Sequence, residues 1–113
     1  MIATEHLEGT LVARLTGDID MANIRAIEDA IATEVKSDAF GLVVDLSAVT
    51  YLDSSGIRLI YRLDERAADR QQRFVLIIPT GAQVTRTLEA AGVIGTVPIV
   101  TTTEQALEAI RAT

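Results

Sequence analysis

The sequence VVDLSAVTYLDSSGIRLIYRL, residues 43–63, joins an apolar strand to a helix through a short run of small polar residues. The helix is predicted from apolar residues that recur at about the 3.6-residue helical period, namely Ile57, Ile60, Tyr61 and Leu63. Asp53, Ser54 and Ser55 precede them, and each can cap a helix because its side-chain oxygen accepts a hydrogen bond from a free N–H group of the first turn. The stretch therefore predicts a helix whose start presents serine hydroxyls.

The D-S-S-G segment, residues 53–56, has two interpretations. In the first it only caps the helix, which is a common use of Ser and Asp at such positions. In the second the helix start receives a phosphate, since the free N–H groups and the helix dipole both favour negative charge there. The segment alone favours capping, and a wider pattern is needed to favour the second interpretation.

Such a pattern is present on both sides of the segment. LVVDLS at residues 42–47 is followed by YLDSSG at residues 51–56, and GTLVARLTGDID precedes both at residues 9–20. In this order the segments resemble the signature of the STAS-domain family, the anti-sigma-factor antagonists of bacteria, over nearly the whole chain. The resemblance implies that the serine directly after the aspartate, Ser54, accepts phosphate from a partner kinase, and Ser55 is the fallback acceptor.

The resemblance also implies a phosphorylation loop and partner-binding surface around Ser54, made of Asp20, Asp53, Ser55 and Gly56, and the position of Arg58 on the predicted helix adds that residue to it. From the residues alone, Asp18 and Asp20 are interpreted as turn and N-cap residues; the resemblance places Asp20 beside the serine loop. Where the family usually continues with Leu-Gly, this chain has Ile57-Arg58. Because Arg58 lies about one helical turn beyond Ser54, its guanidinium can reach the helix start. Otherwise it is an ordinary solvated arginine.

Length and composition describe one domain with an aliphatic core and an acidic surface. The chain has 113 residues, of which 49% are hydrophobic and 4% aromatic. A net charge of −6 disfavours nucleic acid, whose phosphate backbone would be repelled. Without cysteine there are no disulfides or thiolate metal sites, and we find no signal peptide or membrane-spanning apolar run. We expect a single cytoplasmic STAS domain, residues 1–113, with no cofactor, no metal site and no membrane insertion.

Strand and helix patterns alternate along the chain, which predicts an α/β fold. Strands are expected at residues 1–6, 10–16, 42–45, 74–78 and 97–100, and helices near residues 24–35, 55–69 and 82–91 and after Thr102. Pro98 cannot donate to a ladder, so the last strand should lie at an edge of the sheet. The predicted architecture is a mixed sheet of about five strands with about four α-helices, which is also the STAS fold that the resemblance implies.

Several local features are predicted from residue types. Strict alternation in residues 10–16 predicts a strand with one buried and one solvated face. Residues 17–20, Gly-Asp-Ile-Asp, are expected to end that strand, and Asp45 is expected to end the next. Thr102 and Gln105 match a capping box for the last helix.

The residues do not form a recognisable catalytic site. Ser54 has no histidine in a triad and no G-x-S-x-G elbow around it, and the P-loop spacing of glycines is absent. The sole histidine, His6, is expected at an exposed strand end. We therefore expect a binding module and not an enzyme.

The family resemblance implies two functions for such a module. In the first, the unphosphorylated protein binds an anti-sigma factor serine kinase and so frees a sigma factor; phosphorylation of Ser54 by that partner breaks the complex, and a serine phosphatase resets it. In the alternative, it is a STAS interaction subunit of a lipid-transport or stress-signalling assembly, without its own phosphorylation cycle. A weak homodimer is a further option.

Overall fold

The computed structural model describes residues 1–112. These residues form β1 (Ile2–Leu7), β2 (Thr10–Ile19), α1 (Ile24–Glu34), β3 (Gly41–Leu52), α2 (Ser54–Asp69), β4 (Arg73–Ile77), α3 (Thr85–Ala90), β5 (Ile99–Val100) and α4 (Thr103–Arg111). The predicted α/β architecture of a mixed five-stranded sheet with four helices is confirmed.

The strands follow one another across the sheet in the order β1-β2-β3-β4-β5. β1 and β2 are antiparallel, and every other neighbouring pair is parallel. The hairpin turn is tight because Glu8 and Gly9 both take positive φ angles, 51° and 73°, as a turn between twisted antiparallel strands requires. β5 lies at the sheet edge, which confirms the position predicted from Pro98.

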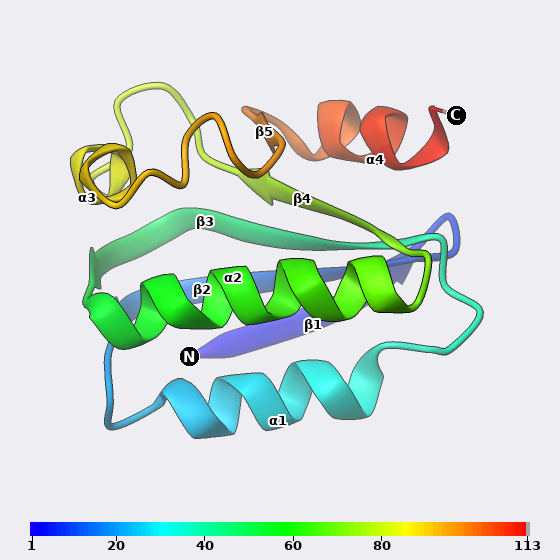
Figure 1. The fold of residues 1–113 in the computed structure, drawn as a ribbon, viewed down its shortest axis with the longest axis horizontal. Coiled ribbons are helices and arrows are strands. Elements are labelled where there is room, and N and C mark those ends of the chain that lie inside the picture. The colour runs from blue at the N-terminus through cyan, green and yellow to red at the C-terminus, as the bar shows by residue number, and fades with distance from the viewer. Residues whose placement is uncertain (113) are drawn as a thin grey trace.

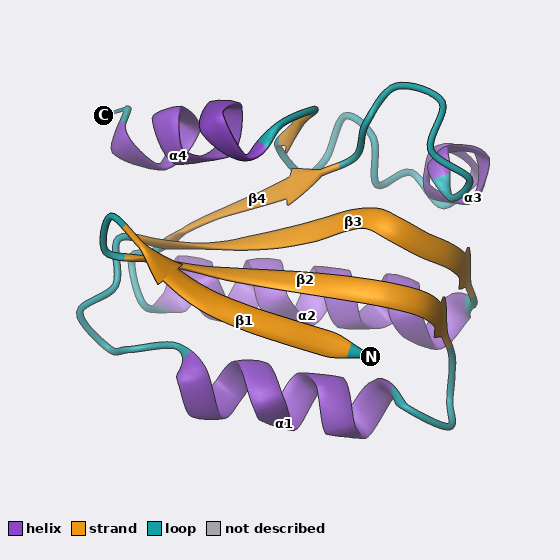
Figure 2. Ribbon diagram, turned by 180° about the vertical axis from the view of Figure 1, so that it is seen from behind, coloured by secondary structure: helices purple, strands orange, loops and turns teal. Residues whose placement is uncertain are grey.

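Helices cover the two faces of the sheet unequally. α1 and α2 lie side by side over one face (Figure 1), where the larger apolar core includes Ile27 and Ile31 of α1 and Leu59 and Leu63 of α2. The opposite face carries a smaller core in which Val12, Val43 and Val75 meet residues of α4. Figure 2 shows this second face, with α4 beside β4 and the three longer strands in front of α2.

The prediction that β2 has one solvated face is wrong. Leu11, Val12 and Ala13 are all fully buried, because α1 and α2 cover one face of the sheet and the smaller core on the α4 side encloses Val12. Gly17 does not end the strand either. The strand runs on to Ile19, and Gly17, with φ 79°, lies where its register with β3 shifts, as in a β-bulge.

Asp45 does not end β3, which continues to Leu52. Its carboxylate is only 8% exposed but is not left unpaired, because the Arg14 guanidinium donates to it at 2.8 Å. A charge satisfied in this way can lie within a strand. Pairing of β3 with β4 stops at Asp45, whereas pairing with β2 continues to Leu52. The ends of β2 and β3 therefore extend beyond the rest of the sheet, toward the start of α2.

Two elements are shorter than predicted. The helix expected at residues 82–91 begins only at Thr85, because Ala82 belongs to a turn that closes on Pro79. The last strand is Ile99–Val100 and not residues 97–100, since Pro98 has no N–H group to donate.

The capping box at the last helix is displaced by one residue. Thr102 caps α4, and its hydroxyl oxygen accepts from the Gln105 N–H at 3.1 Å. The return bond, however, goes from the Thr101 N–H to the Gln105 side-chain oxygen, at 2.9 Å. Both ends of the bridge still satisfy backbone groups at the helix start.

Candidate functional site

Three segments meet at one end of the molecule, at the left edge of Figure 1. The last residues of β2 and β3, Ile19 and Leu52, are paired in register. The Asp53 N–H donates to the Ile19 carbonyl at 3.2 Å, so the start of α2 is fastened to the end of β2. The loop that leads from β2 to α1 begins there too, at Asp20. The sheet thus fixes the helix start against the β2–α1 loop.

Asp53 is the N-cap of α2. Its carboxylate accepts from the Ser55 N–H at 2.9 Å, from the Gly56 N–H at 3.3 Å, and from the Ser55 hydroxyl. The Ser55 hydroxyl bond is the main cause that holds the pKa of Asp53 below its ordinary value, and the backbone N–H groups of Gly56, Ser55 and Met21 add to it. The ionised carboxylate therefore faces both the helix start and the β2–α1 loop.

The two adjacent serines have different environments. Ser54 is the first residue of α2 and is exposed, and within residues 1–112 its hydroxyl makes no side-chain hydrogen bond. Ser55 is 7% exposed, and its hydroxyl donates to Asp53. Of the two predicted acceptors, Ser54 is accessible to a partner and Ser55 is occupied in the cap.

Gly56 seats the helix against the strand ends. A Cβ atom at this position would lie 2.4 Å from Leu52 Cδ1 and 3.4 Å from Ile19 Cγ2. Real Cβ atoms do not approach so closely, so a side chain here would displace either the buried Leu52 side chain or the first turn of α2. The glycine predicted as part of the site therefore sets the position of Ser54 by close packing.

Asp20 lies beside the serine loop, as expected, but it is not an N-cap. Asn23 precedes α1, and the Asp20 carboxylate instead accepts from the Ala22 N–H at 2.9 Å. The Asp20 N–H in turn donates to the Asn23 side-chain oxygen at 3.1 Å. Asp18, the other predicted turn residue, lies within β2 and accepts from the Thr50 hydroxyl of β3 at 2.8 Å. These bonds shape the loop internally and leave it open to solvent.

Arg58 is exposed, and in the described part of the chain it makes no side-chain hydrogen bond or ion pair. The next two arginines of α2 are engaged: Arg62 donates two bonds to Glu28 of α1, at 2.9 and 3.1 Å, and Arg66 donates one at 3.1 Å. The Arg62 hydrogen bond is the main cause that lowers the pKa of Glu28. Arg58 is thus the arginine of this series that is free near Ser54.

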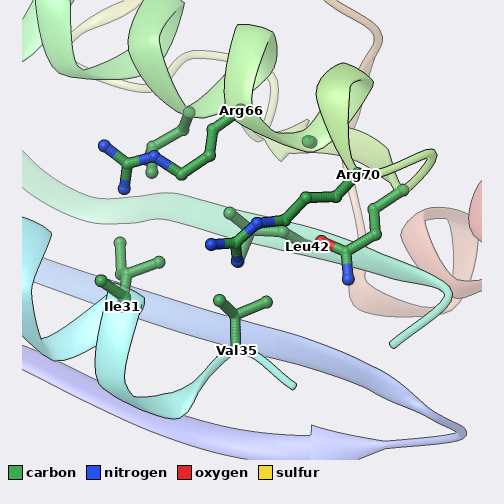
Figure 3. Close-up of a pocket in the computed structure, with 9 residues that line it drawn as sticks. Ile31, Val35, Leu42, Arg66 and Arg70 are labelled. Atoms are coloured by element: carbon green, nitrogen blue, oxygen red, sulfur yellow. The ribbon is translucent and has the colours of Figure 1, made fainter. Parts of the chain in front are cut away.

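A small hollow lies between α1 and α2, toward the far end of α2 (Figure 3). Ile31, Val35 and Leu42 form its apolar wall, and Arg66 and Arg70 reach across it. Its cavity volume is about 10 Å³, which is room for about one water molecule and not for a nucleotide.

The structure also bears on three further expectations from the sequence, which concern metal ligands, membrane-spanning helices and the single histidine. Among residues 1–112, no three His, Cys, Asp or Glu side chains gather as a metal site would require. No described helix has both the length and the apolar character to cross a membrane. His6 lies on exposed β1, 3.6 Å from the Glu34 carboxylate.

Sequence reasoning missed two residues at this end of the molecule. Met21, in the β2–α1 loop, is 78% exposed, and Tyr51, near the end of β3, is 55% exposed. The signal was present: Met21 is an apolar residue among the turn formers Asp20 and Asn23, where burial is not expected.

The family model of the STAS domain matches residues 1–106. The chain belongs to the STAS domain family. Among named STAS proteins, the anti-sigma-F factor antagonist RsfB of Mycobacterium tuberculosis is 29% identical over 103 residues, covering 91% of this chain and 83% of RsfB.

Solved structures of STAS proteins superpose over the whole fold. The crystal structure of an anti-sigma factor antagonist from Mycobacterium paratuberculosis is 30% identical, with a TM-score of 0.87, and the match covers 99% of this chain and 94% of that one. SpoIIAA in its unphosphorylated form matches with a TM-score of 0.77 at 21% identity, over 100% of both chains. At that identity the likeness to SpoIIAA shows the shared fold alone.

Proposed function

We propose that this STAS domain is an anti-sigma factor antagonist that acts by binding and not by catalysis. In its unphosphorylated form it binds an anti-sigma factor of the serine-kinase type, and the sigma factor held by that partner is released. The names of RsfB and of the M. paratuberculosis protein support the class of partner. SpoIIAA, which shares this fold, has been solved in unphosphorylated and phosphorylated forms, so the fold itself can accommodate a phosphorylated state.

The observation that carries the proposal is the exposed Ser54 at the start of α2, beside a neighbouring serine that is buried in the cap. In the proposed cycle the partner kinase transfers a phosphoryl group from ATP to the Ser54 oxygen. A bond forms between the Ser54 oxygen and the γ-phosphorus as the bond from that phosphorus to the β–γ bridging oxygen breaks; ADP leaves, and the hydroxyl proton passes to the catalytic base of the kinase. A serine phosphatase hydrolyses the phosphate and restores binding.

Magnitudes indicate how the phosphate would act. It adds a charge of about −1.5 to −2. Its attraction to the start of α2 is worth about 0.3–2 kcal/mol. Desolvating that charge in an interface without a matching cation costs several kcal/mol, and about 3 kcal/mol already lowers affinity more than 100-fold. The interface effect is larger, so phosphorylation is expected to break the complex while the fold changes little.

The test uses Ser54→Ala with Ser55→Ala as the matched control. Each purified variant is incubated with the candidate kinase and ATP, and phosphate incorporation is mapped by mass spectrometry of peptides. Ser54→Ala should remove phosphorylation and keep the fold, because Ser54 is exposed and Asp53 provides the cap. Ser55→Ala should still be phosphorylated at Ser54. Full phosphate incorporation into Ser54→Ala would show that the assignment is wrong.

A second measurement tests the effect on binding. Ser54→Asp should weaken binding to the kinase, as measured by calorimetry, because the carboxylate supplies part of the charge of a phosphate. Unchanged affinity in this variant, with no phosphorylation of the unaltered protein, would point instead to a STAS interaction subunit without a phosphorylation cycle.

A further inference from the structure

Two large apolar side chains are exposed on the segments that lead to the start of α2. Met21 is 78% exposed and Tyr51 is 55% exposed. Single exposed apolar residues are normal on a protein surface. These two, however, come from separate segments of the chain, the β2–α1 loop and the end of β3, and the fold brings both segments to the same helix start.

Backbone pairing keeps both segments close to the serine. Tyr51 lies three residues before Ser54, so their Cα atoms are at most about 11 Å apart. Tyr51 also pairs in register with Asp18, at the end of β2 from which the Met21 loop departs. The loop that carries Met21 begins directly after Ile19, whose carbonyl accepts from the Asp53 N–H at 3.2 Å. Tyr51 therefore lies on a paired strand, and Met21 lies two residues beyond the end of one.

The chemistry of this surface suits one kind of partner. Methionine and tyrosine are enriched at the centres of protein interfaces, where aromatic anchors contribute most of the binding energy. Carboxylates lie close to them along the chain and across the sheet: Asp18 pairs in register with Tyr51, Asp20 directly precedes Met21, and both are at least partly exposed. A kinase active site carries cations for the phosphates of ATP, and it must approach this end of the molecule to reach the Ser54 oxygen. Charge complementarity thus favours the kinase over a second copy of this acidic chain.

We propose that Met21 and Tyr51 are the apolar anchors by which the serine kinase holds this domain, with Asp18 and Asp20 forming a polar rim toward its basic active site. The inference rests on the proposed function and adds to it the contacts that hold the substrate. Ser54 receives the phosphate, whereas Met21 and Tyr51 determine how tightly the kinase binds before transfer.

The experiment measures KM and kcat for phosphorylation of Ser54, and Kd for the kinase loaded with a non-hydrolysable ATP analogue. The variants are Met21→Ala and Tyr51→Ala. The matched control is Phe40→Ala, because Phe40 is 65% exposed but precedes the opposite end of β3, roughly 30 Å away along the strand. Each anchor variant should raise KM and Kd about 5- to 30-fold and leave kcat within about twofold, whereas the control should change neither.

The possible outcomes separate the two proposals. If the kinase neither binds nor phosphorylates the unaltered protein, the proposed function and this inference both fail. If Ser54 is phosphorylated and both anchor variants keep the original KM and Kd, the inference alone is overturned. The inference is also overturned if the unaltered protein forms a dimer in sedimentation experiments and Met21→Ala dissociates that dimer without changing the affinity for the kinase. Should Tyr51→Ala fail to fold, Met21→Ala decides, since its exposed side chain contributes little to packing.

Discussion

Gly56→Ala is expected to destabilise the domain, although alanine is the better helix former. In a helix interior the exchange gains about 0.5–1 kcal/mol. Here the new Cβ would lie 2.4 Å from Leu52 Cδ1 and 3.0 Å from Leu52 Cγ, inside the packed junction of strand and helix. Overpacking of this kind costs about 1–3 kcal/mol. The packing cost is larger, so the net loss should be about 1–2 kcal/mol.

The assay is urea unfolding of the purified variant, analysed as a two-state transition, which suits a domain of this size. In a thermal scan the same loss corresponds to a fall in Tm of about 4–8 °C. A double-mutant cycle with Leu52→Ala identifies the cause. Removing the Leu52 side chain costs about 2–5 kcal/mol by itself, but it also removes the atoms that the new methyl group would meet.

In the Leu52→Ala background, Gly56→Ala should become neutral or mildly stabilising. The nearest remaining contact is then Ile19 Cγ2 at 3.4 Å, which is close to ordinary van der Waals contact. The coupling energy between the two sites should be about 1–3 kcal/mol, within the range for residues in contact. An equal cost of Gly56→Ala in both backgrounds would refute the close-packing argument.

Three further predictions concern charged residues. Glu28→Gln removes the partner of Arg62 and should cost about 0.5–1 kcal/mol in urea unfolding at neutral pH. The pKa of Glu28 is lowered from its ordinary value of 4.5. The stabilisation is therefore present above pH 4.5 and is lost as the pH falls through the lowered pKa. A difference in stability between the variant and the unaltered protein that persists in strong acid would contradict this. Asp20→Ala should slow phosphorylation of Ser54 and change Tm little; the reverse result would leave Asp20 a loop-forming residue only. Arg58→Gly should speed dephosphorylation and broaden the kinases bound, at about 1 kcal/mol of helix stability; unaltered phosphatase kinetics and kinase panel would make Arg58 an ordinary surface residue.

Local signals in the sequence were sufficient to predict which helices and strands form, but not how far the strands extend. The period of Ile57, Ile60 and Leu63 and the small polar residues before them located α2 and its start correctly. The prediction that the strand ends at Asp45 was wrong because a charged residue suggests a strand end. The partner that satisfies this charge, Arg14, lies 31 residues away in the sequence. The alternation in β2 misled for a related reason, since burial of Val12 depends on the smaller core to which α4 contributes, and α4 lies at the other end of the chain.

The positions of the predicted site residues followed from the sequence more readily than their contacts. Asp20, Asp53 and Gly56 lie around the start of α2, but the sequence does not indicate that the Asp53 carboxylate accepts from the Ser55 hydroxyl and not from that of Ser54. Gly56 acts through contact with Leu52, four residues earlier, which no property of glycine alone indicates. Contacts across the strand–helix junction decide both roles, and these contacts exist only in the folded chain.

The different environments of Ser54 and Ser55 follow from the geometry of a helix start. Once Asp53 is the N-cap, Ser55 lies one turn before Leu59, and both face the sheet. Ser55 is therefore buried, and its hydroxyl must find a partner there, which is the Asp53 carboxylate. Ser54 is turned by about 100° from Ser55 and lies in the same exposed direction as Arg58, one turn later. A phosphate on Ser54 would thus leave the cap intact and change only the surface that a partner meets, as a switch of binding requires.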